Sequence, residues 1–188
     1  MSTTQPIRNL DHVRALANYY MDKGELRNYR LIVLSLHTAL RVSDLLSLRW
    51  SDVYDFKLNR PCKEFTLTEQ KTGKSKTVAI NHHAAKALKK GADTAAPYHF
   101  LFANAHSGKA LVRAQAYRII RNAGEALELP GRISCHSLRK TFGYHAWKKG
   151  ISPAVIMEIY NHSSLSQTRR YLGINQDDLN TVYMSMAF

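Results

Sequence analysis

The chain of 188 residues is long enough to enclose one hydrophobic core, and its 45% hydrophobic content indicates a globular protein rather than a disordered one. Lysine and arginine number 27 against 14 aspartate and glutamate residues, which gives a formal net charge of +13. Such an excess favours a polyanionic partner, so nucleic acid is expected ahead of an anionic membrane surface. The longest apolar run, at residues 31–40, is too short to span a bilayer, and we therefore expect a cytosolic protein with no membrane partner.

Three helices are predicted in the first part of the chain. Residues 10–23 carry apolar side chains at helical spacing and end before Gly24, a suitable residue for a helix C-terminus. Residues 28–40 are apolar on nearly every side, which predicts a helix buried in the middle of the domain. Residues 41–53 repeat leucines in a short amphipathic pattern, which predicts one helix packed on the buried one.

A β-hairpin is predicted at residues 63–81, where apolar and polar side chains alternate on both sides of a turn that contains Gly73. Helical patterns return at residues 82–91, 111–129 and 136–149. Pro153 at a first helical position predicts a further helix, and Ser164 opens a capping-box pattern that predicts a helix through Tyr171. A last amphipathic segment covers residues 177–188. The expected fold class is mainly α with a small antiparallel β-hairpin.

Arg41 lies at the junction of two predicted helices, where its guanidinium is expected to be enclosed rather than on an open face. One interpretation is structural: the arginine is satisfied by a carboxylate or by helix-end carbonyls, with Asp44 as the nearest partner. The functional interpretation is a fixed fork that binds a phosphate through two N–H groups, which a lysine cannot do. This position alone does not decide between the two.

His136 and Arg139 are three residues apart on a predicted helix and so share one face. Such a pair is by itself most often an ordinary surface feature. Lys71 lies at the tip of the predicted hairpin, where most lysines are solvated charges, but near a phosphate it can give a proton to a leaving oxygen. Lys74 and Lys76 lie close enough in sequence to be confused with it.

Metal catalysis is the main chemical rival, because the chain contains nine histidines. The sequence has no H-E-x-x-H, paired-carboxylate or C-x-x-C pattern and no Gly-rich phosphate loop. Cys62 and Cys135 are too few for a disulfide framework and are expected to be free thiols. We therefore expect no metal and no cofactor, so phosphate chemistry would take its charge stabilisation from arginine, lysine and histidine.

Tyr171 is one of ten tyrosines, and its ring could simply pack against the domain. A phenol can also attack a phosphodiester and hold it as a phosphotyrosine, provided that cationic groups stabilise the charge of the transition state. His162 and two arginines, Arg169 and Arg170, lie close to this tyrosine in the sequence. The chemical interpretation therefore depends on whether the fold brings the other candidates to the same place.

Taken in order, these residues resemble the catalytic domain of the tyrosine recombinases, also called the phage integrase family. The segment "TALRVSDLLSLRWSDV" is similar to the family's first arginine box, with Arg41 as its arginine. The segment "EQKTGKSKTVAI" resembles the family's β-hairpin, with Lys71 as the catalytic lysine. The segment "HSLRKTF" matches the H-x-x-R box through His136 and Arg139.

The last box, "YNHSSLSQTRRYLGI", is matched through His162 and the nucleophile Tyr171. Three positions depart from the family pattern, because Ala39 and Asn161 stand where glycine is common and Asp44 stands where glutamate is more frequent. These departures concern packing and turn geometry rather than the reacting groups. The resemblance covers nearly the whole chain.

The resemblance implies a site-specific recombinase or integrase that cleaves and rejoins DNA strands through a covalent 3′-phosphotyrosyl intermediate, without a metal or ATP. Arg41 and Arg139 would then bind the non-bridging phosphate oxygens, and Lys71 would protonate the departing 5′-oxygen. His136 would assist proton transfer at the tyrosine, and His162 would donate a hydrogen bond to the phosphate.

The implied partner is double-stranded DNA in the bacterial cytosol or nucleoid, as on a mobile element. Family members act as tetramers on paired sites through a C-terminal segment that docks on a neighbour. Residues 179–186 have apolar side chains at roughly helical spacing, which suits this docking and equally suits packing on their own domain. A monomer without DNA is compatible with either. We expect residues 1–188 to form one catalytic domain, with no core-binding or arm-binding domain. The alternatives are a DNA-binding regulator with an inactive recombinase fold, a type IB topoisomerase and a metal-dependent nuclease.

Overall fold

The computed structural model describes residues 4–174 and 176–186 of the chain. These residues form a mainly helical fold with two small antiparallel sheets, which confirms the expected class. Among them, no helix is both long and apolar enough to cross a membrane.

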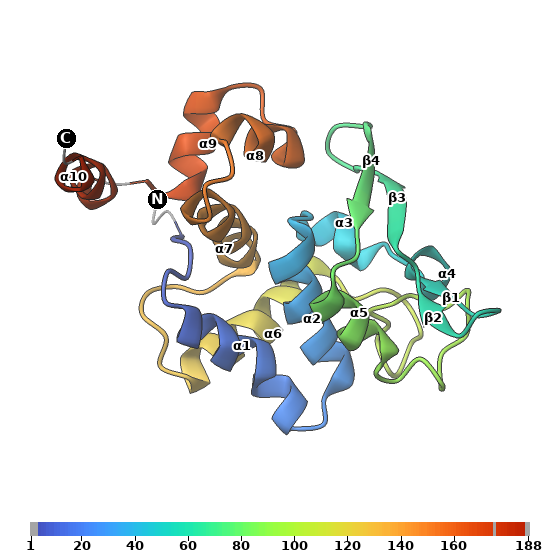
Figure 1. Cartoon of the computed structure of the whole chain (residues 1–188). Helices are drawn as coiled ribbons and strands as arrows, with labels where there is room; N and C mark the ends of the chain where they lie inside the picture. The colour runs from blue at the N-terminus through green and yellow to red at the C-terminus, as the bar shows by residue number, and fades with distance from the viewer. Residues whose placement is uncertain (1–3, 175, 187–188) are drawn as a thin grey trace.

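Helix α2 (Leu26–Thr38) lies in the middle of the main helical body of the molecule. Helices α1 (Leu10–Asp22), α5 (His82–Lys89) and α7 (Cys135–Lys148) pack against it (Figure 1). Nearly every side chain of α2 is buried, as expected for a helix that is apolar on all sides. The prediction of a buried central helix is therefore confirmed.

The segment after α2 forms two short helices, α3 (Val42–Leu46) and α4 (Trp50–Val53), where the sequence predicted one. Between them the Leu48 carbonyl accepts a hydrogen bond from the Leu101 amide at 2.8 Å, and Arg49 forms an antiparallel bridge with Phe100. The prediction of one helix is wrong here, because a pairing that is distant in sequence takes the backbone groups that a continuous helix would use.

The predicted hairpin is confirmed as β3 (Glu64–Thr68) and β4 (Ser75–Ala79), paired antiparallel with Phe65 opposite Val78. Gly73 has a φ of 66° in the turn, a left-handed conformation that glycine adopts without strain. A second pair, β1 (Tyr54–Asp55) and β2 (Arg60–Pro61), was not predicted. Strands of two residues are too short to show an alternating pattern.

The remaining predicted helices are confirmed as α6 (Arg113–Ala126), α8 (Pro153–Tyr160), α9 (Leu165–Leu172) and α10 (Gln176–Ser185). Helices α7, α8 and α9 pack together above the α2 core, and α10 extends away from them (Figure 1). Gly143 of α7 permits this close packing, because a Cβ atom there would overlap the Tyr160 hydroxyl and the Leu172 side chain. The end of the last predicted segment, residues 187–188, lies outside the described residues.

An N-terminal strap, residues 4–9, crosses α7 and reaches the connection between α9 and α10. The Ile7 amide donates to the Thr141 hydroxyl at 2.8 Å, and Arg8 Nη2 donates to the Gly173 carbonyl at 2.6 Å. Arg8 Nη1 also lies 3.6 Å from the buried carboxylate of Asp178 at the base of α10. The strap therefore holds the segment that follows α9 against the body of the domain.

We expect the Arg8→Ala variant to lose about 1 kcal/mol of unfolding free energy, because the Gly173 carbonyl and the Asp178 carboxylate both lose the charged group that they contact. Urea denaturation followed by circular dichroism measures the change. Arg14→Ala is the matched control, since its ion pair with Asp11 is largely exposed at 71% and 81% and should contribute almost nothing. Equal midpoints for the two variants would show that Arg8 does not hold this connection.

Candidate active site

Two guanidinium groups meet at the end of helix α8. Arg139 Nη2 donates to the Tyr160 carbonyl at 3.1 Å, and Arg41 Nη2 reaches the same oxygen at 3.4 Å. Arg139 also donates through Nη1 to the Ala39 carbonyl at the end of α2, and it is almost fully buried. The fold thus brings together Arg41 and Arg139, which are 98 positions apart in the sequence. Their N–H groups form the kind of fixed fork that can bind phosphate oxygens.

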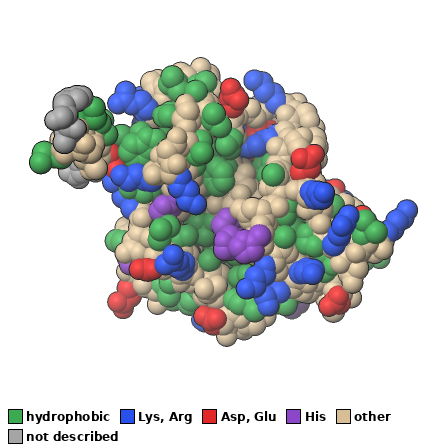
Figure 2. All heavy atoms as spheres, viewed as in Figure 1, with side chains coloured by type: hydrophobic (Ala, Val, Ile, Leu, Met, Phe, Trp, Pro, Cys, Tyr) green, Lys and Arg blue, Asp and Glu red, His purple; other side chains and the backbone are tan. Residues whose placement is uncertain are grey.

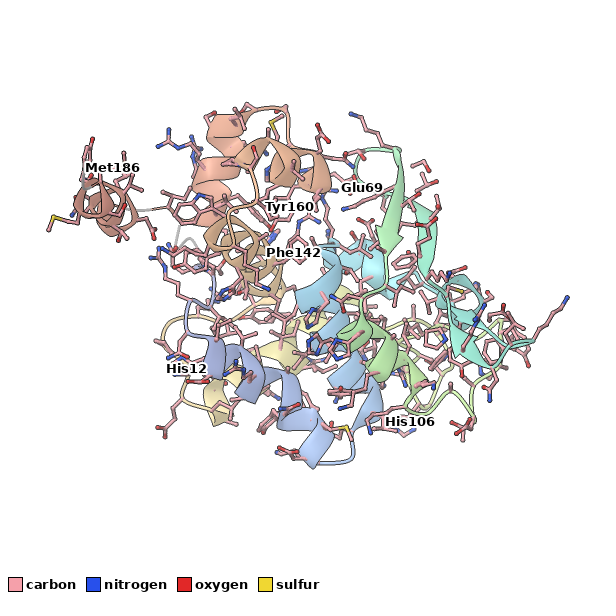
Figure 3. The ribbon with its side chains drawn as sticks, in the orientation of Figure 1. His12, Glu69, His106, Phe142, Tyr160 and Met186 are labelled. Carbon is pink, nitrogen blue, oxygen red and sulfur yellow. The ribbon has the colours of Figure 1, made fainter. Side chains whose placement is uncertain are left out.

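Glu69, between the two strands of the hairpin, is the ion-pair partner of Arg41, with 2.8 Å between Oε1 and Nη1. Burial alone would raise the pKa of Glu69, but hydrogen bonds from Asn161 and Thr72 and the charge of Arg41 outweigh it and hold the pKa below its usual value. Figure 3 labels Glu69 and Tyr160 on the hairpin and on α8, where these two parts of the fold approach each other.

Asp44 is not the partner of Arg41 in this arrangement, so the sequence-based expectation for this pair is wrong. Its Oδ1 atom instead accepts the backbone N–H of Gln70 at 2.9 Å, and the side chain is buried beneath the start of the hairpin turn. The carboxylate of Glu69 is better placed because the hairpin folds back over the start of α3. Asp44 therefore supports the hairpin, and Glu69 orients the arginine.

Two lysines of the hairpin differ in their surroundings. Lys71 is exposed at the tip and lines, with Arg41 and Arg113 among others, an open groove of about 690 Å³. Its charge is among those that lower the pKa of His162, so the tip lies toward the arginine cluster. Lys76 on β4 is instead half-buried, and its Nζ donates to the Ile159 carbonyl at 2.6 Å.

Tyr171 lies in the last turn of α9, and its half-buried ring packs against the rings of Tyr160 and His162, each with a centroid distance of 5.1 Å. Its hydroxyl is 3.3 Å from Nδ1 of His136. Burial raises the pKa of Tyr171, and the positive charges of Arg139 and Arg41 offset this only in part. The phenol is therefore protonated near neutral pH and has to lose its proton to react as a nucleophile.

His136 is suited to accept that proton. Desolvation of its ring and the positive charges of Arg139 and Lys140 lower the pKa of His136 below its usual value. The imidazole is therefore neutral near pH 7, and a neutral ring can use one nitrogen as an acceptor. With Nδ1 as the acceptor, the 3.3 Å contact is a path for the phenolic proton.

His162 packs edge-on against the Tyr171 ring. Its Nδ1 atom lies 3.0 Å from the hydroxyl oxygen of the buried Thr168. Burial and the charges of Arg139, Arg41 and Lys71 lower the pKa of His162 to about 4, so the ring is neutral at physiological pH. The Thr168 hydroxyl also lies 3.3 Å from the Ser164 carbonyl, a second acceptor for its proton. When the hydroxyl donates to Nδ1 of His162, Nε2 carries the ring proton and is available to donate to a phosphate oxygen.

Comparisons with known proteins show which family the chain resembles along its length. Residues 9–177 match the phage integrase family. The chain belongs to this family. Over 183 residues, 97% of each chain, it is 34% identical to the "Probable integrase/recombinase YoeC" of Bacillus subtilis (strain 168). It is also 30% identical to the tyrosine recombinase XerC of Roseiflexus sp. (strain RS-1), with 80% of this chain and 48% of that protein covered.

The family is that of the tyrosine recombinases, and the fold is that of their catalytic domain. The crystal structure of XerA recombinase is similar with a TM-score of 0.79 and 22% identity, covering 99% of this chain and 68% of that one. XerH site-specific recombinase in a post-cleavage complex with its difH substrate gives a TM-score of 0.77 and 18% identity, covering 98% and 54%. The chain spans nearly the whole of its Bacillus relative but about half of the XerC and XerH chains.

The two glycine positions of the family pattern have a physical explanation in this tyrosine recombinase. Ala39 and Asn161 both have positive φ angles, of 53° and 52°, in the left-handed region where glycine is favoured. Both close a helix, and both carry a contact of the site: the Ala39 carbonyl accepts from Arg139, and the Asn161 amide donates to Glu69 at 2.8 Å. The departures from glycine are therefore accommodated at helix ends that hold the arginines.

Several residues of this recombinase site gave no clear signal in the sequence. Glu69 reads as an ordinary polar residue of a turn, and Tyr160 as one aromatic among many. In the structure, Arg139 stacks over the Tyr160 ring at 4.6 Å, and the Tyr160 hydroxyl donates to the Arg139 carbonyl at 2.6 Å. Across residues 4–174 and 176–186, no three His, Cys, Asp or Glu side chains are grouped as metal ligands.

Proposed function

We propose that this tyrosine recombinase domain cleaves DNA at a specific site and rejoins it through Tyr171. The observation that carries this proposal is the contact of 3.3 Å between the Tyr171 hydroxyl and a neutral His136, beside the arginine cluster. The phenolic oxygen forms a bond to the scissile phosphorus, and the bond from phosphorus to the 5′-oxygen breaks. A 3′-phosphotyrosyl link and a free 5′-hydroxyl result.

In this reaction His136 takes the phenolic proton as Tyr171 attacks. Arg41 and Arg139 bind the non-bridging oxygens, and their fixed positions stabilise the charge of the transition state without reorganisation. His162 donates to the same phosphate, and Lys71 gives a proton to the departing 5′-oxygen. Rejoining reverses these transfers.

The reaction needs neither a metal nor ATP in this proposal, because the phosphotyrosyl link keeps the energy of the phosphodiester bond that was broken. The 5′-hydroxyl of a partner strand can therefore attack the link and release Tyr171. Arginine, lysine and histidine supply the positive charge and the proton transfers. No cofactor is proposed.

Double-stranded DNA is the proposed substrate. The net charge of +13 supports it, and Figure 2 shows lysine and arginine side chains spread over much of the visible face. A structure of similar fold also supports a DNA substrate, because XerH site-specific recombinase is bound to its difH substrate. A protein that acts on DNA would work in the bacterial cytosol or nucleoid.

Exchange of strands between two duplexes would need several copies of the chain, and we propose a tetramer on paired sites. Helix α10 supports this, because it extends from the body and exposes Val182 at 55%, Tyr183 at 77% and Met184 at 87% (Figure 1). Exposed apolar side chains of this kind are suited to dock on a neighbouring copy. The free protein can be a monomer in this proposal.

Trapping the covalent link tests the function, and the target sequence can be selected in the same experiment. Nicked duplexes with a randomised segment are incubated with the protein, and strands that stay attached after denaturation are sequenced. We expect attachment through a 3′ end, unaffected by EDTA. Loss in EDTA would favour a metal-dependent nuclease, and absence of any adduct would favour a DNA-binding regulator. Supercoil relaxation without exchange of partners would favour a topoisomerase.

Lys71→Met is expected to slow cleavage about 100-fold or more, because the 5′-oxygen leaves without a proton donor. A bridging sulfur at that 5′ position should restore most of the rate, since a thiolate leaves readily without protonation. The measurement is the rate of adduct formation on the oxygen and sulfur substrates. Lys74→Met, on the same exposed turn, is the control and should behave as the wild type. A Lys71 defect that persists with sulfur would assign Lys71 to DNA binding instead.

A further inference from the structure

Lys76 has no role in the proposed reaction, yet its ammonium lies in the same cluster as the two arginines. Its Nζ donates to the Ile159 carbonyl at 2.6 Å. The next carbonyl along α8, that of Tyr160, accepts from Arg139 at 3.1 Å and is reached by Arg41 at 3.4 Å. Three cations from three different elements thus meet the C-terminal end of α8, where the helix dipole is negative.

The position of Lys76 on its strand is unusual for a lysine. Side chains alternate along a strand, so Lys76 lies on the same face as the buried Val78, while Ser75, Thr77 and Ala79 are exposed on the other face. An inward-facing lysine costs free energy unless its charge is matched by hydrogen bonds and opposite charges. The Ile159 carbonyl provides the hydrogen bond, and this contact joins the hairpin to α8.

We propose that Lys76 is a positioning residue of the cleavage site, which docks the hairpin on the last turn of α8 and so orients the two arginines and the turn that carries His162. This inference rests on the proposed function of the site. The docked turn, Asn161 and His162, follows directly after the Ile159 carbonyl that accepts from Lys76 and the Tyr160 carbonyl that accepts from the arginines. Without Lys76, the hairpin loses its hydrogen bond to the Ile159 carbonyl at the end of α8, next to the two arginines that are proposed to bind the phosphate.

The positioning contact depends on pH. Four charged groups face the ammonium: Arg139 of α7, Arg41 at the start of α3, Asp44 of α3, and Glu69 of the hairpin turn. Burial and the two arginines lower the pKa of Lys76 to about 8, against the smaller opposite effect of the two carboxylates. The lysine is therefore charged below pH 8 and loses its charge above it. Cleavage should slow as the pH rises through this value.

The test measures single-turnover adduct formation on the selected site by Lys76→Met and Lys76→Arg. We expect Lys76→Met to be about 10-fold to 100-fold slower at pH 7, because small displacements of catalytic groups have effects of this size. A bridging sulfur should not restore the rate, since Lys76 is not the proton donor. Lys76→Arg should keep most of the rate at pH 7 and, because arginine stays charged, should not slow between pH 7 and pH 9 as the wild type does.

The outcomes separate this inference from the proposed function. Lys74→Met is the control on the same hairpin, and a Lys76→Met rate equal to the control rate would overturn the inference alone. Restoration of Lys76→Met by sulfur would also overturn it, because it would assign proton transfer to Lys76. If Lys76→Met does not fold, Lys76→Arg decides, and a fall above pH 8 like that of the wild type contradicts the positioning role. A wild-type protein that forms no adduct would overturn the proposed function and this inference together.

Discussion

Replacing Tyr171 by phenylalanine is expected to abolish the covalent protein–DNA adduct, a loss of at least about a thousandfold, while DNA binding stays within about twofold of the wild type. The ring of Tyr171 packs against Tyr160 and His162, and phenylalanine keeps both ring contacts. Only the hydroxyl is removed, and with it the atom that would bond to phosphorus. Denaturing gels with labelled DNA measure the adduct, and filter binding measures affinity.

Tyr183→Phe is the matched control for that variant. It removes a phenol that is 77% exposed on helix α10, and this helix lies apart from α8 and from the β3–β4 hairpin (Figure 1). Phenylalanine keeps the apolar ring that the proposed docking of α10 would use, so the adduct of Tyr183→Phe should equal that of the wild type in single-turnover cleavage. If Tyr171→Phe still formed the adduct and Tyr183→Phe did not, the nucleophile would be on α10 and the assignment of Tyr171 would be wrong.

Local signals in the sequence were sufficient for the parts of the site that lie close together along the chain. The Ser164 hydroxyl oxygen accepts a hydrogen bond from the backbone N–H of Gln167 at 3.2 Å. The predicted N-cap therefore fixes the start of the helix that carries Tyr171. The capping box is only half formed, because the Gln167 side chain contacts Ser163 rather than Ser164. The cap therefore predicts the helix that carries Tyr171, whereas its role as the nucleophile comes from the resemblance to the family and stays a prediction.

Long-range pairings were not predictable in the same way. Arg41 has a carboxylate three positions away in sequence, but the fold gives it Glu69, which the hairpin returns to the start of α3. The break between α3 and α4 has the same origin, because the backbone of Arg49 pairs with Phe100. A periodic pattern reports which face of an element is buried and says nothing of which distant segment covers it.

The arginines show a further limit of sequence reasoning. Arg139 is oriented by the carbonyls of Ala39 and Tyr160, and Lys76 by that of Ile159. Every residue has a carbonyl group, so no residue type marks these contacts in the sequence. What the sequence does mark is the backbone that makes them possible, since Ala39 stands at a position where the family commonly has glycine and where φ is positive.

Arg139→Lys is expected to slow adduct formation about 100-fold to 1000-fold at saturating DNA, because one ammonium cannot replace a fork that binds two oxygens. Arg139 is 3% exposed and holds two carbonyls from different helices, so the variant should also lose about 1–3 kcal/mol of unfolding free energy. Single-turnover rates below the melting temperature of the variant separate the chemical effect from the loss of stability.

Arg170→Gln, which removes the charge, is the control for this variant, because Arg170 lies next to Tyr171 on α9 but is exposed. An exposed arginine of this kind is expected to touch the DNA backbone or a neighbouring subunit, so its removal should weaken binding and the dependence of binding on salt rather than the rate at saturation. The buried and the exposed arginine therefore differ in which measurement they change. A wild-type rate for Arg139→Lys at saturating DNA would place Arg139 in the scaffold of the domain, with Arg41 and His162 left to stabilise the transition state.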